Sequence, residues 1–272
     1  MRYAQLVVGP AGCGKSTYCK AMQDHILLMK RKADVINLDP GAEHFDYEPM
    51  IDIRELINVQ DAMEDEELHF GPNGGLVFCM EYLFENLDWL QDKLGEQEDE
   101  YILFDCPGQI ELFTHIPAMR KFIERLQSWN FNVCVVFLID VQFMTDGPKF
   151  ISGTMAALSV MLKMNTQHVN ILSKMDLLSK AMQKRINRFL DPNTEALLDE
   201  ISTDNFITFN EKYMKLTESI ADIVSDYSLI SFVPLNLHNE ESMTNALITI
   251  DNALQYGENE EVKTRDFEEE DD

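Results

Sequence analysis

Residues 9–16 of the chain read GPAGCGKS, which matches the pattern GxxxxGK[ST]. The string follows a short apolar run, Tyr3–Val8, and leads into a stretch of helical pattern, Lys15–Lys30. A strand, a glycine turn and a helix in this order can cradle a phosphate, because the glycines let successive backbone N–H groups turn inward and the helix N-terminus adds its positive end. The chain is therefore expected to build a sheet that carries such a loop at its carboxyl edge.

Other short apolar runs recur along the chain with helical stretches between them. They do not alternate with polar residues, so they predict strands buried on both faces, and the helical spacers make neighbouring strands parallel. The predicted fold is α/β, a doubly wound and mainly parallel sheet of the P-loop NTPase class with helical insertions. The further strand candidates are Val35–Leu38, Tyr101–Phe104, Val133–Ile139, Val169–Leu172 and Ile230–Val233. The further helix candidates are Leu76–Lys93, Ile110–Gln127, Pro148–Leu162, Ala181–Phe189, Phe209–Ser225 and Met243–Gln255.

The domain organisation follows from where this alternation is interrupted. Residues 1–257 are expected to form one P-loop domain, with an insertion at 41–75 and a helical insertion at 191–210. Residues 258–272 hold nine acids and two bases. A segment of that charge with few apolar residues is expected to be disordered.

Charge and cysteine content narrow the class of partner and the compartment. The chain has 48 acidic against 22 basic residues, for a formal charge of −26, and its five cysteines are scattered. Such a charge repels phosphate backbones and anionic lipids, so we expect no direct nucleic-acid partner and no membrane partner. Unpaired cysteines and the lack of a long apolar run indicate a cytosolic or nuclear protein with reduced thiols.

The glycine-rich loop supplies the first candidate site residues. Lys15 is positioned to reach the β- and γ-phosphates of a nucleotide, and the Ser16 hydroxyl to ligate Mg²⁺. A glycine turn capped by serine is the alternative interpretation of the same string. The nucleotide-binding candidates here are Gly12, Cys13, Gly14, Lys15, Ser16 and Thr17.

Acidic residues follow two of the predicted strands. Asp105 begins the string DCPG, whose Gly108 can offer its N–H to a γ-phosphate, and Asp39 follows the second strand candidate. Since the carboxyl ends of parallel strands share one edge, Ser16, Asp39 and Asp105 are the predicted Mg²⁺ ligands.

The chain has no serine or threonine from Tyr18 through Phe113, so it cannot use the switch hydroxyl of Ras-like proteins. Asp39 is instead the first candidate to orient or deprotonate an attacking water, and Gln109 and Glu111 are the others. A turn or capping role for Asp39 before Pro40 is the alternative.

The string Ser173-Lys174-Met175-Asp176 ends the fifth strand candidate. A carboxylate at Asp176 can accept both the N1–H and the exocyclic amine of guanine, while the stem of Lys174 covers the base plane. This predicts GTP and GDP as ligands, with ordinary surface residues as the alternative. A nucleotide kinase would need several basic residues to clamp a second phosphate substrate, and only Arg54 and Lys93 lie between Asp39 and Glu100. Hydrolysis is therefore favoured over transfer.

The sequence resembles the GPN-loop GTPases in four strings taken together: GPAGCGKS, Gly71-Pro72-Asn73, DCPGQIE and SKMD. The sequences that flank these strings resemble the third eukaryotic branch of that family. The resemblance runs from Arg2 to about Tyr256. It implies paired subunits in which Gly71, Pro72 and Asn73 reach the partner's phosphate site, with the Asn73 amide near the departing γ-phosphate. Two departures stand out. Ser173 occupies a position usually held by Asn or Thr, which predicts a weaker tie to the phosphate loop, and the expected last guanine loop near Pro234–Asn236 matches poorly.

The resemblance also implies a biological role. It points to a heterodimer with a sister GPN-loop GTPase, with a homodimer as the alternative, acting in the assembly and nuclear import of RNA polymerase II and contacting its subunits. It places the protein in the cytoplasm with shuttling to the nucleus.

From the residues alone three classes of function stay open: a GTP-hydrolysing switch, a nucleotide-binding assembly factor with negligible turnover, and an ATP-dependent phosphotransferase. The phosphate loop lacks the extra lysine of related dimeric ATPases, which makes Arg54 or Asn73 the candidate substitute.

Overall fold

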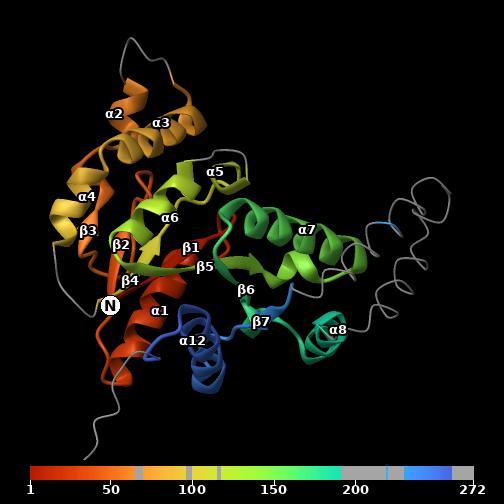
Figure 1. Ribbon diagram of the computed structural model, residues 1–272. Coiled ribbons are helices and arrows are strands. Elements are labelled where there is room, and N and C mark those ends of the chain that lie inside the picture. Colours follow the sequence, from red (N-terminus) through yellow and green to blue (C-terminus); the bar gives the residue numbers. More distant parts are fainter. Residues whose placement is uncertain (65–69, 96–99, 115–117, 191–218, 220–229, 259–272) are drawn as a thin grey trace, which may run out of the picture.

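The computed structural model describes residues 1–64, 70–95, 100–114, 118–190, 219 and 230–258 (Figure 1). The predicted insertion at 191–210, most of the predicted helix 209–225 and the tail after residue 258 lie outside these residues. None of the helices in this part of the chain combines the length and apolar character needed to cross a membrane.

Seven parallel strands form one sheet in the order β3-β2-β4-β1-β5-β6-β7. The six predicted strands are all present, and the α/β prediction is confirmed. The seventh, β3, has two residues and pairs with β2 through Ile36 and Ile51, which is too short to give a sequence pattern. The strands are β1 Arg2–Val8, β2 Asp34–Asn37, β3 Ile51–Asp52, β4 Tyr101–Asp105, β5 Phe131–Asp140, β6 Gln167–Ser173 and β7 Phe232–Pro234.

Both faces of the sheet are covered by helices. On β1, Ala4 and Leu6 belong to one hydrophobic core, whereas Tyr3 and Val7 belong to the other, as the two-residue period of a strand requires. Helices α1 (Lys15–Leu28) and α12 (Glu240–Leu254) lie on one side, and α6 (Ala118–Ser128) and α7 (Gly147–Met164) lie on the other (Figure 1). This double covering explains why the strands read as continuous apolar runs.

Two long predicted helices are divided in the structure. The stretch Leu76–Lys93 forms α3 (Pro72–Glu85) and α4 (Leu87–Leu94), separated at Asn86. The Asn86 side chain donates to the carbonyl of Tyr82 at 2.8 Å, which satisfies the end of α3 and lets α4 start in a new direction. The stretch Ile110–Gln127 likewise gives α5 (Glu111–Thr114) and α6, with residues 115–117 outside the described part.

Helix α3 also changes the interpretation of the Gly-Pro-Asn string. Gly71 is the N-cap of α3 and Pro72 its first residue, a position where the missing N–H of proline has no consequence. The string is therefore the start of a helix and not the plain loop that its glycines suggest. A Cβ on Gly75 would lie 3.2 Å from the Met63 side chain in α2 (Val59–Glu64), so a small residue lets these two helices pack closely.

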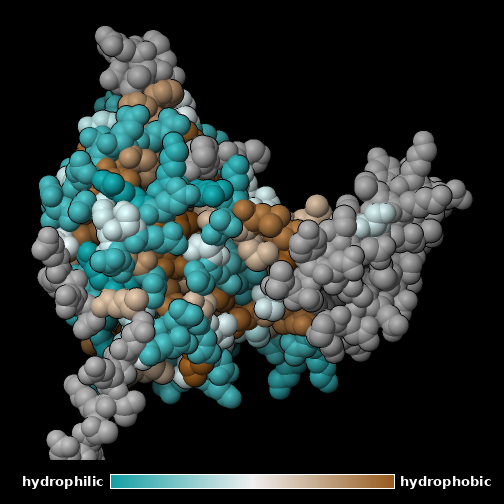
Figure 2. All heavy atoms as spheres, viewed as in Figure 1, coloured by the Kyte–Doolittle hydropathy of each residue, from teal (hydrophilic) through white to brown (hydrophobic). Residues whose placement is uncertain are grey.

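The remaining described elements are short or lie at the sheet edge: η1 Ile53–Glu55, η2 Val141–Met144, η3 Met175–Leu177 and α8 Lys180–Leu190. The face seen in Figure 2 is largely hydrophilic, but hydrophobic side chains gather over the start of α7. Phe143, just before α7, is 59% exposed, and Met155 within it is 46% exposed. This apolar surface lies next to the phosphate loop: a hollow of about 380 Å³ is lined by Pro10, Phe143 and Pro148, among others.

Candidate nucleotide-binding site

The turn between β1 and α1 needs glycine at its two ends. Gly9 has φ +150°, and a Cβ there would lie 2.3 Å from the carbonyl oxygen of Leu138 on β5. Gly14 caps α1 in the left-handed conformation, with φ +95°. Both conformations suit glycine alone among common residues, so the loop predicted from GxxxxGK[ST] is present with its N–H groups beside a helix start.

Lys15 is buried, although it carries a charge. Only 8% of its surface is exposed, and its Nζ donates to the carbonyls of Gly9 and Pro10 at 3.2 and 3.3 Å. Both acceptors are neutral, so the charge is left to act on its surroundings. It lowers the pKa of Asp39 and of Asp105, against the stronger effect of burial on each. The cation therefore sits beside both predicted acids.

Asp105 ends β4 with its two carboxylate oxygens in different environments. Oδ2 accepts a hydrogen bond from the Tyr47 hydroxyl at 2.7 Å, whereas Oδ1 is buried and has no hydrogen-bond partner among the described residues. Burial raises the pKa of Asp105, and the neighbouring Asp39 raises it further, while the hydroxyls of Ser16 and Tyr47 act in the opposite direction. A half-satisfied buried carboxylate favours a cation or a proton at its free oxygen.

The turn after Asp105 touches the phosphate loop. A Cβ on Gly108 would lie 2.8 Å from Cα of Ala11, so only glycine allows this approach. Gln109 follows and donates to Oδ1 of Asn73, at 2.7 Å. Glu111 is exposed at the start of α5. The structure thus brings Gly108, Gln109 and Asn73 together beside the loop.

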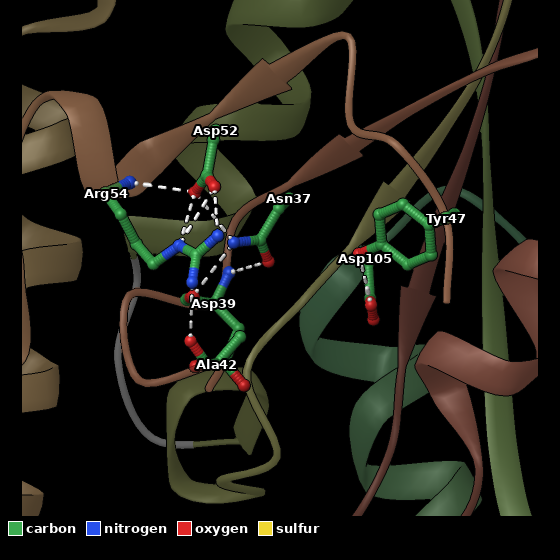
Figure 3. Close-up of polar contacts among 7 residues, drawn as sticks. All are labelled: Asn37, Asp39, Ala42, Tyr47, Asp52, Arg54 and Asp105. Atoms are coloured by element: carbon green, nitrogen blue, oxygen red, sulfur yellow. Dashed lines mark hydrogen bonds and ion pairs between the residues drawn. The ribbon is translucent and has the colours of Figure 1, made fainter. Parts of the chain in front are cut away.

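Asp39 lies where predicted, directly after β2, and it is held by the backbone around it. Its carboxylate accepts the N–H of Gly41 at 2.9 Å. Its own N–H donates to Oδ1 of Asn37 at 3.0 Å (Figure 3). Burial raises the pKa of Asp39 above its ordinary value. The amide of Asn37 also donates to Asp52, at 2.9 Å, which ties Asp39 to β3.

The sequence made Arg54 a candidate substitute for the missing lysine of the phosphate loop, but its side chain is bonded elsewhere. It makes several hydrogen bonds to Asp52 and donates to the carbonyl of Ala42 at 2.9 Å (Figure 3). Its guanidinium lies 4.8 Å from the ring centre of Phe45, which stacks on Tyr47 with centroids 4.7 Å apart. As a substitute for the missing loop lysine it is therefore a poor candidate, because its charge is already paired.

The acids present fit a magnesium ion. The described residues contain no group of three or more His, Cys, Asp or Glu side chains able to hold a metal. Mg²⁺ beside a nucleotide needs fewer protein ligands, since phosphate oxygens and waters fill most of its shell. The free Oδ1 of Asp105, with Ser16 near it, offers the hard oxygen ligands that this ion prefers.

On the other side of the loop, Ser173 and Lys174 contact the phosphate-loop backbone. Ser173 Oγ lies 2.8 Å from the carbonyl oxygen of Cys13 and 3.1 Å from that of Ile139, so its one hydroxyl proton is shared between them and the side chain does reach the phosphate loop. That this tie is weaker than one made by Asn or Thr stays a prediction. Lys174 has φ +62° and donates to the carbonyl of Gly12 and to Asp140 at 2.6 and 2.7 Å. These bonds place the Lys174 stem across the loop.

Asp176 is exposed in η3, two residues beyond Lys174. The backbone N–H of Met175 donates to the carbonyl of Leu235 at 3.2 Å. The predicted last guanine loop, 234–236, therefore lies against the SKMD turn, although its sequence matches the pattern poorly. Its contact is made by the main chain, which carries no sequence signal.

Sequence reasoning missed Tyr47, Asp140 and the Asn37–Asp52–Arg54 network. Asp140 ends β5 and was recoverable by the rule that found Asp39, because both follow a buried apolar run. Tyr47 lies outside any helix or strand, where no periodicity marks a residue as functional. The network joins residues of β2, β3 and η1, and the two-residue β3 could not be predicted.

Comparison with known proteins shows which family, relatives and solved structure this chain resembles. A family model described as a conserved hypothetical ATP binding protein matches residues 7–256. A protein named GPN-loop GTPase 3 from Danio rerio is 53% identical, over 96% of this chain and 91% of its own length. Proteins of the same name from Xenopus tropicalis and Dictyostelium discoideum are 53% and 46% identical, covering 98% and 96% of this chain and 96% and 90% of their own lengths. The fold resembles that of a GTPase from Pyrococcus abyssi in its apo form, with a TM-score of 0.76, 23% identity and coverage of 94% of this chain and 98% of that one.

Proposed function

The chain belongs to the GPN-loop GTPase family, and we propose that it binds GTP with Mg²⁺ and hydrolyses it to GDP and inorganic phosphate. The observation that carries this proposal is the meeting of four parts at one sheet edge: the glycine-rich loop with Lys15, the half-buried Asp39, the buried Asp105 and the Lys174 turn. Each part serves a different piece of a nucleoside triphosphate.

The triphosphate is held by the loop. Backbone N–H groups of 12–17 and the start of α1 bind phosphate oxygens, and Lys15 exchanges the carbonyls of Gly9 and Pro10 for the β- and γ-phosphates. Ser16 and Asp105 hold Mg²⁺, and Asp39 lies near them. When bound, the ion neutralises charge that develops between the β- and γ-phosphates.

Hydrolysis needs a positioned water and a group that accepts its proton. Water attacks the γ-phosphorus, the bond from that phosphorus to the β–γ bridging oxygen breaks, and GDP leaves. Asp39 takes the proton from the water, a role favoured by its raised pKa. Gln109 and Gly108, beside Ala11, position the departing phosphoryl group, and Glu111 is the remaining candidate for the water.

Base selection rests on Asp176. Its exposed carboxylate can receive two donors from guanine, which adenine lacks, while Lys174 and Ser173 fix the turn against the phosphate loop. The family model's description mentions ATP, whereas the named relatives are GTPases. The decisive experiment is therefore single-turnover hydrolysis of GTP and of ATP by the same protein. Hydrolysis of GTP with little cleavage of ATP is expected, and equal cleavage would overturn the guanine assignment.

A nucleotide-binding assembly factor with negligible turnover is the second candidate. It is favoured by the bond between Gln109 and Asn73, which occupies the amide that a water-holding glutamine would need. The same experiment separates the two candidates, because tight GTP binding without single-turnover hydrolysis would support the factor. An ATP-dependent phosphotransferase is disfavoured, since Arg54 is paired with Asp52 and unavailable to a second phosphate substrate.

We also propose that the protein acts as a dimer in which Asn73 serves the partner's site. Support comes from the family resemblance and from the exposed apolar surface beside the phosphate loop, which includes Phe143. Within one chain, however, Asn73 already lies 2.7 Å from Gln109, so action in its own site is the competing arrangement. The partner is a sister GPN-loop GTPase, or a second copy of this chain.

A mixing experiment distinguishes the two arrangements. Asn73→Ala subunits are combined with Lys15→Ala subunits, or with the matching variant of the sister protein. If Asn73 acts across the interface, the nucleotide site of the Asn73→Ala subunit receives an intact Asn73 and hydrolyses GTP, whereas each variant alone does not. A mixed dimer that forms and stays inactive would assign Asn73 to its own chain.

The cellular role that the resemblance implies is assembly and nuclear import of RNA polymerase II, by a cytoplasmic protein that shuttles to the nucleus. We propose it on the resemblance alone. Depletion of the protein should leave the large polymerase subunits in the cytoplasm, and rescue should require an intact Lys15. Normal nuclear import after depletion would contradict the proposal.

A further inference from the structure

Tyr47 brings a buried hydroxyl to the acid that ends β4. It lies between β2 and β3, is 4% exposed, and donates to Oδ2 of Asp105 at 2.7 Å. No serine or threonine occurs from Tyr18 through Phe113, so a phenol is what this interval supplies at that carboxylate. A deeply buried polar group in direct contact with a candidate metal ligand requires an explanation beyond packing.

The bond makes the two oxygens of Asp105 unequal. Oδ2 is occupied by Tyr47, while Oδ1 is buried without a hydrogen-bond partner in the described part of the chain. A carboxylate anchored through one oxygen loses rotational freedom, so the other oxygen keeps a fixed direction. Neighbours that orient a metal ligand in this way influence metal affinity strongly, although they never touch the metal.

Tyr47 is held in place through its ring as well as through its hydroxyl. Its ring stacks on Phe45 with centroids 4.7 Å apart and an interplanar angle of 9°, and the Arg54 guanidinium lies over Phe45. Arg54 is anchored by Asp52 and donates to the carbonyl of Ala42 (Figure 3). The phenol therefore reaches Asp105 from a braced segment, 42–47, and its position is determined before any ligand arrives.

We propose that Tyr47 is a positioning residue for the divalent cation: its hydroxyl holds Oδ2 of Asp105 so that Oδ1 remains directed at the ion that accompanies the nucleotide. The inference rests on the proposed function. It assigns Tyr47 to metal affinity and not to nucleotide contact, because the hydroxyl is used up on Asp105.

The test compares nucleotide binding with and without the metal. Fluorescent GDP is titrated against wild type and Tyr47→Phe in excess EDTA, and again over a range of free Mg²⁺ concentrations. Tyr47→Phe keeps the ring that stacks on Phe45 and removes only the hydroxyl. The affinity in EDTA should be unchanged, and the Mg²⁺ concentration that gives half of the metal-dependent tightening should rise about tenfold, the lower end of the effect known for groups that support metal ligands.

A matched control and a double variant sharpen the result. Tyr82→Phe removes a hydroxyl from a 38% exposed tyrosine in α3 and should leave the Mg²⁺ midpoint unchanged. If Tyr47 acts through Asp105, then Tyr47→Phe should add no shift in an Asp105→Asn background. Thermal unfolding of each variant confirms that it is folded.

Four outcomes decide the matter. The inference is supported if Tyr47→Phe raises the Mg²⁺ midpoint in the wild-type background and causes no further shift in the Asp105→Asn background. An unchanged midpoint, or an affinity loss equal with and without Mg²⁺, overturns it while leaving the proposed function in place. A shift that persists in the Asp105→Asn background also overturns it. Wild type that binds neither GDP nor GTP at any Mg²⁺ concentration overturns the proposed function together with the inference.

Discussion

Asp105 and Asp140 end the two strands that flank β1, and their carboxylates are treated in opposite ways. Asp140 accepts the backbone N–H of Gln142 through Oδ1 at 2.8 Å and pairs with Lys174 through Oδ2 at 2.7 Å. Asp105 has one oxygen bound by Tyr47 and the other without a hydrogen-bond partner among the described residues. Within the described part of the chain, both carboxylate oxygens of Asp140 have partners, whereas only one oxygen of Asp105 does.

The difference assigns separate tasks to the two sides of the phosphate loop. In the partly buried ion pair of Asp140 and Lys174, both charges are compensated before any ligand binds. A half-satisfied carboxylate such as Asp105 keeps a deficit that a cation can fill. In the proposed function, the side of β2 and β4, called the metal side here, binds metal and phosphate, and the side of β5 and β6, called the base side, holds the turn that contacts the base.

Removing Lys15, whose positive charge acts on both Asp39 and Asp105, should have the largest effect. Lys15→Ala is expected to abolish measurable GTP binding, because the phosphates lose their charged donor. Asp39 and Asp105 also lose the positive charge that favours their ionised forms. Since Lys15 is buried, the free energy of unfolding should fall as well, by about 1–3 kcal/mol. Isothermal titration with GTP and chemical denaturation measure the two effects.

Lys20→Ala is the matched control for this prediction. Lys20 lies on the same helix and makes an exposed ion pair with Asp24 at 2.8 Å. Its loss should change stability by no more than about 0.5 kcal/mol and leave GTP affinity unaltered. A folded Lys15→Ala protein with wild-type affinity would show that the loop does not bind the triphosphate.

The second prediction separates chemistry from binding on the same side. Asp39→Ala should lower the single-turnover rate of GTP hydrolysis by about 10²–10⁴-fold, the range expected for loss of a general base. Affinity should change far less, because the carboxylate is bound by the N–H of Gly41 and lies off the phosphate loop. If hydrolysis proceeds normally, Gln109 or Glu111 must hold the water instead.

The comparison also explains what the sequence could predict. The glycine-rich loop, Asp39, Asp105 and the SKMD turn all follow buried apolar runs, and the parallel sheet that those runs predict brings strand ends to one edge. The fold and the candidate site residues could therefore be predicted together. The same logic reaches Asp140, which was passed over because no motif contains it.

Contacts that pass through irregular segments could not be inferred. The bond from Tyr47 to Asp105 joins residues 58 positions apart, and the tyrosine lies in neither a helix nor a strand. The hydrogen bond from Ser173 to the carbonyl of Cys13 likewise joins residues 160 positions apart, and no local pattern marks it. Helix α3 was placed too late, since the glycines of 71–75 resemble a loop and only the position of Pro72 marks a helix start.

The base side offers the third prediction. Asp176→Asn should weaken GTP binding by about 10–100-fold, because two hydrogen bonds to a charged acceptor are lost or weakened. Affinity for xanthosine triphosphate should rise, since the new amide can donate to the carbonyl that this base carries in place of the amine. Because Asp176 is exposed, stability should stay within about 0.5 kcal/mol of wild type.

Competition between GTP and xanthosine triphosphate for a fluorescent nucleotide measures this preference. Glu241→Gln, which neutralises an exposed acid on α12, controls for the change of net charge. Should Asp176→Asn discriminate between the bases as wild type does, the base would have to bind elsewhere. The contrast with Lys15→Ala is the informative point: Lys15→Ala should lose nucleotide binding and stability together, whereas Asp176→Asn should change the base preference and keep its stability.

The two sides should also differ in how pH affects their stability, and His168 on β6 allows a test. Its ring lies against Phe137, Nε2 is 2.9 Å from Oδ1 of Asn170, and burial lowers the pKa of His168 to about 4. A depressed histidine pKa means that the unfolded chain binds the proton more readily. Its contribution is thus fully present above pH 6.5 and is lost as the pH falls toward 4. Burial raises the pKa of Asp39 and Asp105, so on the metal side stability changes with pH in the opposite sense.

His168→Gln removes this group while keeping a donor for Asn170. Chemical denaturation between pH 7 and pH 4.5 should therefore show wild type losing stability faster than the variant, with a difference that grows by up to about 2 kcal/mol as the pH falls. Parallel curves for His168→Gln and wild type would mean that the His168 ring takes up its proton without cost, as a solvated surface group does. In that case the difference between the two sides of the phosphate loop would be limited to Asp105 and Asp140.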